Sequence, residues 1–313
     1  MRGADWVIGR GLLGRAVARR IDGEVFHWPI DWSVPSASVG DLREALVSFT
    51  DGEARPRRIY WCAGSGVTST GADRLNAEVR VFEDFLAAIG ELPDEVRASL
   101  TFFLASSVGG VYGGNPHPPY SEHSATAPIS AYGEAKLRME QALERCVVEN
   151  GIRGLVGRIT NLYGPGQNLA KGQGLISVIC KTYLTREPAS IFVSMDTIRD
   201  YIFEEDCAAI VLAVVRQVEA GVNGGSLVIK IIGSENAVSI GELIGEIRRI
   251  RRRAPLIVIG SAGGAGQAPD LRVRSTVMPE LGALVDTTLA AGIHSTFAAM
   301  SSERFAADAG LTP

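Results

Sequence analysis

The stretch ADWVIGRGLLGRAVARRI, residues 4–21, decides the fold of this 313-residue chain. It reads as a short apolar strand, a glycine-rich turn and a helix with basic residues along one side. Gly9, Gly11 and Gly14 form the pattern GxGxxG: the first permits a tight turn, the second lets the backbone approach a pyrophosphate, and the third lets helix and strand pack closely. Because the pattern follows a strand and opens a helix, it predicts a dinucleotide site. The residues expected to bind the cofactor here are Gly9, Arg10, Gly11, Leu12, Leu13 and Gly14.

The choice between NAD and NADP depends on the second expected strand, EVFHW at residues 24–28. A carboxylate near the end of that strand would bind the hydroxyls of the adenosine ribose. The strand instead runs into Pro29, and Asp31 lies beyond that proline, while Arg10 in the glycine turn could meet a 2′-phosphate. We predict NAD as the cofactor and leave NADP open.

Short apolar strands continue to alternate with amphipathic helices along the first half of the chain. This alternation predicts an α/β fold, a doubly wound parallel sheet covered by helices on both faces. Further strands are expected at 57–64, 100–107, 154–164 and 225–232, and helices at 12–21, 41–49, 72–89 and 208–219. Asp41 is the expected N-cap of the second helix.

The regularity weakens after about residue 165, which indicates a second unit. We expect a dinucleotide-binding domain over residues 1–165 together with about 207–232. Residues 166–206 and 233–313 are expected to form a smaller α/β lobe that binds the substrate. Residues 261–269, SAGGAGQAP, read as a flexible loop.

Composition excludes several classes of protein. Hydrophobic residues make up 46% and charged residues 21%, with a formal charge of −4, which argues against a nucleic-acid partner. The basic run at 248–253 more simply ends a helix. No apolar stretch reaches the roughly 20 residues of a membrane span, and the N-terminus is not a secretory signal. The four cysteines and four histidines are scattered, so we expect no metal site and a cytoplasmic protein with reduced thiols.

Two serines end the strand at 100–107. In an open parallel sheet, ligands bind beyond the carboxyl ends of the strands. Ser106 and Ser107 are therefore expected to face the crevice, although they could also only cap a loop.

Tyr132 and Lys136 lie one helical turn apart in ISAYGEAKLRMEQ, residues 129–141. Their side chains project from one helix face, so the ammonium can stabilise a phenolate and lower the pKa of a phenol that is otherwise near 10. Such a phenol can exchange a proton with a substrate hydroxyl while hydride moves at the same carbon. After a glycine turn and a strand ending in two serines, this pair predicts an oxidoreductase site.

Six motifs in order resemble the extended short-chain dehydrogenase/reductase family, which contains nucleotide-sugar epimerases, dehydratases and 4-keto reductases. They are VIGRGLLG, SSVGGVYG, YGEAK, RITNLYGPGQ, RDYIFEED and GSENAVSIGELI. The resemblance covers most of the chain. It implies a Rossmann-type domain with a small C-terminal substrate lobe.

The resemblance also implies roles for individual residues. Tyr132 would be the catalytic acid and base, Lys136 would bind the nicotinamide ribose and tune the tyrosine, and Ser107 would hold the reacting oxygen. Ala63 and Gly64, at the end of the family's fourth strand, would line the cofactor together with Ser106.

Substrate contacts are implied in the same way. Asn161 would contact the sugar nucleotide, although it could be only a turn residue. Arg199 would pair with the substrate diphosphate, although it could form a local ion pair with Asp200. Asn76 matches an asparagine that the family often carries on the next helix.

The chain departs from the family pattern at three places besides the missing acidic residue. Ile8 replaces the first glycine of the usual GxxGxxG. The usual Ser/Thr slot falls on Val108, so either Ser107 or a neighbour supplies the hydroxyl. Gly109 and Gly110 replace the Asp-Glu pair of 4,6-dehydratases, which disfavours dehydration.

What remains is hydride exchange at the sugar C4. We expect an NAD-dependent UDP-hexose 4-epimerase acting on a UDP- or dTDP-linked sugar. An NAD(P)H-dependent 4-keto-sugar reductase is the alternative within the class, and a non-catalytic dinucleotide-binding regulator is the alternative outside it. A homodimer is expected, packed through the helix that carries Tyr132 and the helix at 73–90.

Overall fold

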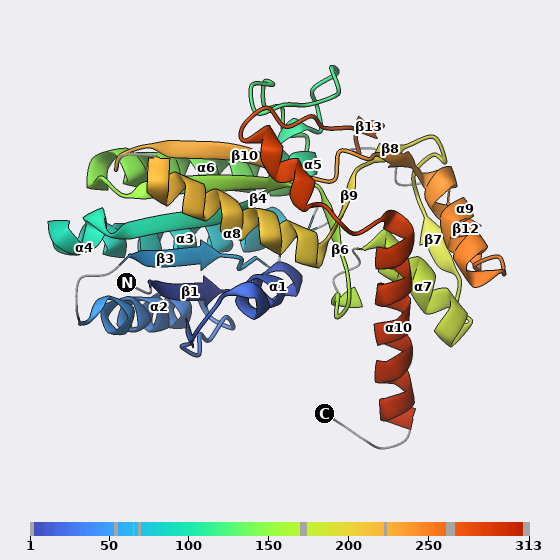
Figure 1. Ribbon diagram of the computed structural model, residues 1–313, viewed down its shortest axis with the longest axis horizontal. Coiled ribbons are helices and arrows are strands. Elements are labelled where there is room, and N and C mark those ends of the chain that lie inside the picture. Colours follow the sequence, from blue (N-terminus) through green and yellow to red (C-terminus); the bar gives the residue numbers. More distant parts are fainter. Residues whose placement is uncertain are drawn as a thin grey trace.

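The computed structural model describes residues 3–52, 56–64, 66–67, 70–169, 174–221, 224–260 and 267–308. Its main element is a sheet of six parallel strands in the order β10-β5-β4-β3-β1-β2 (Figure 1). The strands are β1 (Ala4–Ile8), β2 (Val25–Phe26), β3 (Arg57–Trp61), β4 (Leu100–Ser107), β5 (Arg153–Ile159) and β10 (Leu227–Ile232). From β1 the chain moves to β2 on one side and then returns to β3 on the other. The strand order therefore reverses between β1 and β3, and a ligand crevice forms at such a point.

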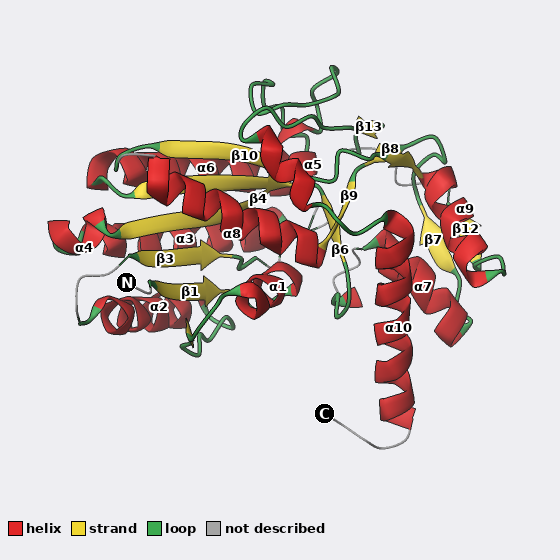
Figure 2. Ribbon diagram, viewed as in Figure 1, coloured by secondary structure: helices red, strands yellow, loops and turns green. Residues whose placement is uncertain are grey.

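Helices cover both faces of this sheet (Figure 2). On one face lie α2 (Pro35–Thr50), α3 (Ala72–Gly90) and α6 (Ala131–Asn150), and on the other lie α1 (Leu12–Arg20) and α8 (Glu204–Gly221). Residues of β1 are buried throughout, as in a strand covered on both sides. The predicted doubly wound α/β fold is confirmed.

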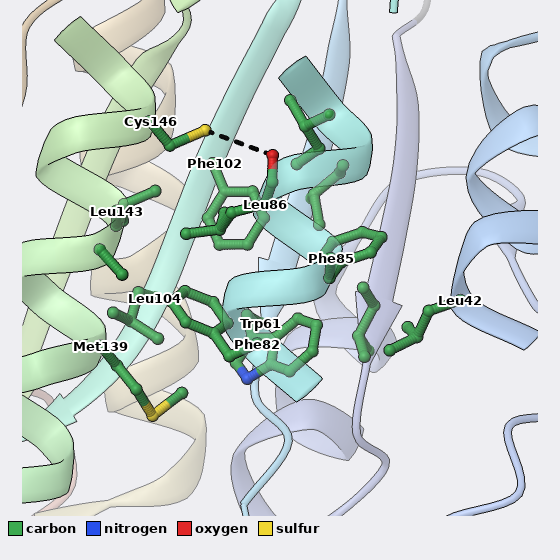
Figure 3. Packing of buried hydrophobic residues seen from close by; sticks show 14 of the residues in the cluster. Leu42, Trp61, Phe82, Phe85, Leu86, Phe102, Leu104, Met139, Leu143 and Cys146 are labelled. Atoms are coloured by element: carbon green, nitrogen blue, oxygen red, sulfur yellow. Dashed lines mark hydrogen bonds between the residues drawn. The ribbon is translucent and has the colours of Figure 1, made fainter. Parts of the chain in front are cut away.

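Aromatic side chains fill the core beneath α3 and α6 (Figure 3). Trp61 of β3 lies 5.0 Å from Phe82 of α3 between ring centroids, and Phe85 lies 6.3 Å from Phe102 of β4. From α6, Cys146 donates its thiol hydrogen to the Leu86 carbonyl at 3.8 Å. These contacts fix α3 against the sheet and α6 against α3, and α6 is the helix that carries Tyr132.

The second unit is built from short strand pairs and three helices. Its ladders are β6 with β9, β7 with β12, and the order β11-β8-β13. The strands are β6 (Asn161–Tyr163), β7 (Ala189–Ile191), β8 (Ile198–Arg199), β9 (Tyr201–Phe203), β11 (Val238–Ser239), β12 (Ile257–Ile259) and β13 (Asp270–Leu271). The helices are α7 (Leu175–Thr185), α9 (Ile240–Arg251) and α10 (Leu289–Asp308). They enclose a separate apolar cluster that includes Ile179, Leu243 and Ile293.

Three shorter helices complete the described structure. They are α4 (Asp94–Ala98), α5 (Val108–Tyr112) and the 3-10 helix η2 (Pro279–Leu284). Leu281 of η2 packs into the cluster between α8 and the sheet, so this part of the C-terminal region contacts the large unit. The division of the chain into two domains at the residues given above stays a prediction.

Several expected boundaries differ from the structure. Helix α2 begins at Pro35, so Asp41 lies inside the helix and is not its N-cap; its carboxylate accepts from the Asp31 N–H at 2.7 Å. A proline at the first helical position is favourable because it lacks an N–H that would have no partner there. The strand expected at 24–28 is only Val25–Phe26.

Two further boundaries concern the site. The strand expected at 154–164 is interrupted at Thr160 and becomes β5 and β6, which belong to different sheets. Ala63 and Gly64 follow β3, the third strand along the chain, and not the fourth.

The basic run at 248–253 ends α9, with Arg248, Arg249 and Arg251 in the last turn, as predicted. Most of the loop expected at 261–269 lies outside the described residues.

Within the described ranges, no helix is both long enough and apolar enough to cross a membrane.

Candidate active site

A cleft of about 820 Å³ lies at the carboxyl edge of the sheet, between the large unit and the smaller lobe. The glycine turn, the end of β4, the start of α6 and residues of β8 all line it. Every predicted site residue lines this cleft except Gly9 and Gly14. The sequence-based prediction therefore brought together residues that the fold also brings together.

Gly9 and Gly14 have structural roles beneath the cleft. Gly9 has a φ of +87°, and a β-carbon there would overlap the backbone of Ala63. A β-carbon on Gly14 would overlap the Gly9 carbonyl oxygen. These two glycines thus allow the tight turn and the close packing of α1 on β1.

Gly11 differs from its two neighbours because a β-carbon there would meet nothing within 4 Å. It is the N-cap residue of α1, and no side chain caps the helix. Leu12 and Leu13, the first helical residues, line the cleft, so the positive end of α1 faces it. The turn offers backbone N–H groups and open space to a pyrophosphate, and it fits a dinucleotide cofactor.

The acidic residue expected at the end of β2 is absent from the cleft. Asp31 is exposed, accepts from the Ser33 N–H at 2.8 Å and does not line the cleft. Hydrogen bonds from the Ser33 side chain and backbone lower the pKa of the Asp31 carboxyl. Arg10 is exposed and lines the cleft.

Tyr132 and Lys136 stand in the first and second turns of α6. The helix begins after Ser130, whose hydroxyl accepts from the Gly133 N–H at 3.2 Å. Tyr132 is half-buried, whereas Lys136 is buried and donates to the Ala105 carbonyl of β4 at 3.3 Å. The Lys136 Nζ lies 5.9 Å from the centroid of the Tyr132 ring. A fixed ammonium therefore adjoins the phenol at the cleft, as the spacing predicts.

Glycines on two sides position the Tyr132 ring. A β-carbon on Gly110 would lie 3.3 Å from the ring Cε1, and one on Gly66 would lie 3.5 Å from Cδ2. Helices α5 and α6 also cross closely, because a β-carbon on Gly133 would overlap the Gly110 carbonyl oxygen. Gly110, one of the two glycines at the Asp-Glu positions of dehydratases, is thus the residue against which α6 packs.

The two serines have different environments. Ser107 is the N-cap of α5, and its hydroxyl accepts from the Gly110 N–H at 3.2 Å. A β-carbon on Gly110 would lie 3.3 Å from both the Ser107 β-carbon and the Tyr132 Cε1, so the serine and the tyrosine ring are neighbours. Ser106 is buried and donates to Glu140 at 2.5 Å. Val108, at the usual Ser/Thr slot, is buried in an apolar cluster with Tyr112. Of these three residues, Ser107 is the half-exposed hydroxyl beside the tyrosine.

Asn161 and Arg199 lie across the cleft from the glycine turn. The Asn161 amide donates to the Asp200 carbonyl at 2.8 Å, which leaves the amide oxygen as a hydrogen-bond acceptor. Arg199 is buried and donates to the carbonyl of Ile198 at 2.8 Å and to Gln267 at 3.4 Å. Burial lowers the pKa of the Arg199 guanidinium, and Asp270 partly opposes that effect. The local ion pair with Asp200 is not formed, because Asp200 accepts from Thr160 and Ser234 instead.

Cys62 lines the cleft near two cationic side chains, Lys136 and Arg10. Burial raises the pKa of the Cys62 thiol to about 12, even though Lys136 and Arg10 both act to lower it. The thiol is therefore neutral at physiological pH. Among the described residues, no group of three or more His, Cys, Asp or Glu side chains is placed to hold a metal ion.

Sequence reasoning missed several residues of the cleft. Arg15 of α1 donates to the Gly166 carbonyl at 2.5 Å and so joins the glycine-turn helix to the loop after β6. Phe192 and Gln267 line the opposite wall. Arg15 belongs to the basic side of its helix, which was a usable signal. Phe192 and Gln267 lie outside helices and strands, where no periodic pattern identifies them.

Comparisons with known proteins agree with this geometry. The model of a family described as "NAD dependent epimerase/dehydratase family" matches residues 7–229. A UDP-glucose 4-epimerase of Azospirillum brasilense is 29% identical over 168 residues, which cover 50% of this chain and 47% of the relative. A dTDP-4-dehydro-6-deoxyglucose reductase of Escherichia coli is 35% identical over 103 residues, covering 33% of this chain and 32% of the relative. The matched stretches thus span about half or less of these curated relatives.

The fold is also that of solved structures. A structure of MoeE5 in complex with UDP-glucose and NAD superposes with a TM-score of 0.77 at 20% identity, covering 96% of this chain and all of that chain (100%).

Proposed function

The chain belongs to the NAD dependent epimerase/dehydratase family, and from this premise we propose that it is an NAD-dependent 4-epimerase of a UDP-linked hexose. The observation that carries the proposal is the placement of the half-buried Tyr132 and the buried Lys136 on one cleft with the glycine turn. A relative that is 29% identical over half of this chain is a UDP-glucose 4-epimerase, which supports the same activity.

The residues at the glycine turn would hold the cofactor. Backbone N–H groups at Gly11, Leu12 and Leu13 would bind the pyrophosphate at the N-terminus of α1. Lys136 and the residues after β3, Ala63 and Gly64, would bind the nicotinamide end. When bound, NAD supplies a hydride acceptor and donor for the sugar C4.

The chain's own part in the reaction is to move one proton. The Tyr132 phenolate would remove the proton of the C4 hydroxyl as C4 is oxidised to a ketone, and the phenol would return it when C4 is reduced on the other face. Lys136 favours the phenolate through its charge. Because a hydroxyl is both donor and acceptor, Ser107 can cap α5 and also donate to the C4 oxygen.

The opposite wall would hold the nucleotide part of the substrate. Arg199 is a buried guanidinium, a group suited to bidentate contact with a diphosphate. Asn161 would accept from, or donate to, the sugar. With Gly109 and Gly110 at the acid and base positions of 4,6-dehydratases, proton exchange at C4 is what the site retains.

A 4-keto-sugar reductase is a second candidate. The relative that is 35% identical over a third of this chain is a dTDP-4-dehydro-6-deoxyglucose reductase, and the same tyrosine and lysine would serve that reaction. The difference lies in cofactor turnover, because a reductase consumes NAD(P)H whereas an epimerase regenerates its NAD.

We also propose that the protein is a cytoplasmic homodimer. Helices α3 and α6 pack side by side on one face of the sheet and could pair with those of a second copy. All four cysteines carry free thiols, which suits a reducing compartment.

The experiment is to incubate the protein with NAD and a panel of UDP-hexoses and to follow C4 inversion by NMR. We expect interconversion of one C4 pair, and a loss of about 10²–10⁴-fold in kcat for Tyr132→Phe with NAD affinity retained. Tyr183→Phe is the matched control, because its hydroxyl bonds the distant Arg253 carbonyl. Consumption of NADPH with a 4-keto sugar, and no inversion, would identify the reductase instead.

A further inference from the structure

A carboxylate on α3 adjoins the Tyr132–Lys136 pair. Glu78 is half-buried, and its Oε2 accepts from the Gly66 N–H at 3.3 Å. A β-carbon on Gly64 would lie 3.1 Å from the Glu78 Oε1 and 3.6 Å from the Lys136 Nζ. The carboxylate and the ammonium therefore both lie near the same point beside Gly64.

The same carboxylate also approaches the tyrosine. A β-carbon on Gly66 would lie 3.7 Å from the Glu78 Oε2 and 3.5 Å from the Tyr132 Cδ2. Gly64 and Gly66 both line the cleft, and neither places a side chain between Glu78 and the pair. Glu78 is thus close enough to act electrostatically on both residues.

Other titratable groups also lie around the pair. Glu140, one turn beyond Lys136 on α6, is held by Arg158 of β5. Arg138 of α6 donates to the Asn76 side chain of α3 at 2.8 Å. Cys62 below the cleft stays neutral because burial raises the pKa of its thiol to about 12, and Arg10 faces that thiol from the glycine turn.

We propose that Glu78 is a positioning residue that sets the charge balance of the Tyr132–Lys136 pair. Its negative charge offsets part of the lysine's positive charge beside the phenol. Its hydrogen bond to Gly66 also holds the segment at 64–66 that borders the nicotinamide end of the predicted cofactor site. This inference rests on the proposed function, since it concerns the proton that Tyr132 exchanges.

The test is the pH dependence of kcat for E78Q. Removing the negative charge favours the phenolate, so the acidic limb of the profile should move to lower pH, by about 0.5–1 unit for a charge at this range. The control E134Q removes an exposed carboxylate from α6 between Tyr132 and Lys136 in sequence, and its limb should stay within about 0.2 unit of wild type because solvent screens it. E78D, which restores the charge, should return the limb toward wild type.

A second measurement does not depend on turnover. The ultraviolet phenolate band, taken as the difference between wild type and Y132F, gives the pH midpoint of that one phenol. We expect E78Q to lower this midpoint in the same direction. An unchanged midpoint together with an unchanged rate profile would overturn the proposal and leave Glu78 as a loop anchor.

The two proposals can fail separately. If no nucleotide sugar is turned over but the midpoint still falls in E78Q, the epimerase proposal fails and the electrostatic role of Glu78 stands. If C4 inversion occurs and E78Q shifts neither the acidic limb of the rate profile nor the phenolate midpoint, the epimerase proposal stands and the electrostatic role of Glu78 fails.

Discussion

Arg158 of β5 holds Glu140 of α6 in a buried ion pair, with its Nη2 2.6 Å from Oε2 and its Nε 3.2 Å from both carboxylate oxygens. Ser106 donates to the same carboxylate, and Arg158 also donates to the Tyr112 hydroxyl at 2.5 Å. This network joins the end of β4, β5, α5 and α6, the helix that carries Tyr132. The position of Tyr132 therefore depends on a charge cluster whose Arg158, Glu140 and Tyr112 do not themselves line the cleft.

Replacement of Glu140 by Ala should lower the free energy of unfolding by about 3–5 kcal/mol, because it leaves Arg158 buried without a counter-charge. Urea denaturation measures this loss. The double variant E140L/R158M should recover most of it. As a control, E91Q breaks the exposed pair with Arg43 and should have little effect on the free energy of unfolding, because solvent screens that pair. Equal losses in the buried and exposed variants would contradict the argument.

Gly133→Ala should destabilise the protein by at least about 2 kcal/mol and slow turnover as well. The new methyl group would overlap the Gly110 carbonyl oxygen, a backbone atom that cannot rotate away, so α5 and α6 must separate. Gly40→Ala in α2 is the matched control, because its β-carbon meets nothing within 4 Å. There alanine should stabilise by about 0.5–1 kcal/mol. Thermal unfolding of both variants tests the pair, and a neutral Gly133→Ala would refute the close crossing.

Arg199→Ala should weaken binding of UDP and of the UDP-sugar by about 10²-fold or more, while NAD binding stays within about twofold of wild type. Arg199→Lys should recover only part of the loss, because an ammonium lacks the planar fork. Isothermal titration with UDP measures this directly. Arg272→Ala, which removes an exposed arginine paired with Asp270, should leave the affinity unchanged. A full loss of NAD binding in Arg199→Ala would show that Arg199 binds the cofactor and not the substrate diphosphate.

Glu204→Gln should stabilise the protein above neutral pH and have little effect in acid. Burial raises the pKa of the Glu204 carboxyl from 4.5 to about 7, against the opposing charge of Arg19. A raised pKa means that the folded state binds the proton more tightly. The stability contribution is therefore complete below about pH 4.5 and is lost as the pH rises through about 7.

Glutamine imitates the protonated acid, so the gain at pH 8 should be about 1–3 kcal/mol in the free energy of unfolding. Denaturation curves at pH 5 and pH 8 measure it. Glu205→Gln is the control: it removes the more exposed neighbour that contacts Arg19 and Arg20, and it should lower stability at pH 8. The same sign for both variants at pH 8 would count against a raised pKa of the Glu204 carboxyl.

Much of the large unit follows from local patterns. Continuous apolar runs such as residues 100–107 form strands that are buried on both faces, and Gly9, Gly11 and Gly14 have the separate steric roles that their spacing predicts. Tyr132 and Lys136 meet because residues one helical turn apart share a face. These features depend on interactions between neighbours in sequence.

The rest depends on contacts between distant segments. The start of α2 at Pro35 was missed because Asp41 offered a plausible cap, whereas the structure uses Asp41 to hold the loop before the helix. Glu78 lies on an ordinary helix face, and only the fold brings it beside Lys136. Helix α10 was not predicted, because its small and apolar residues form no clear stripe.

The two walls of the cleft differ in how freely they can vary. On the sheet side, backbone meets backbone at Gly9, Gly14 and Gly133, so almost any added atom disrupts the turn or the helix that carries Tyr132. The facing wall comes from the start of α7, from strands of two or three residues such as β7 and β8, and from segments outside regular structure. New ligand preferences can therefore evolve by a few substitutions on the facing wall, while the reaction chemistry is inherited unchanged with the sheet.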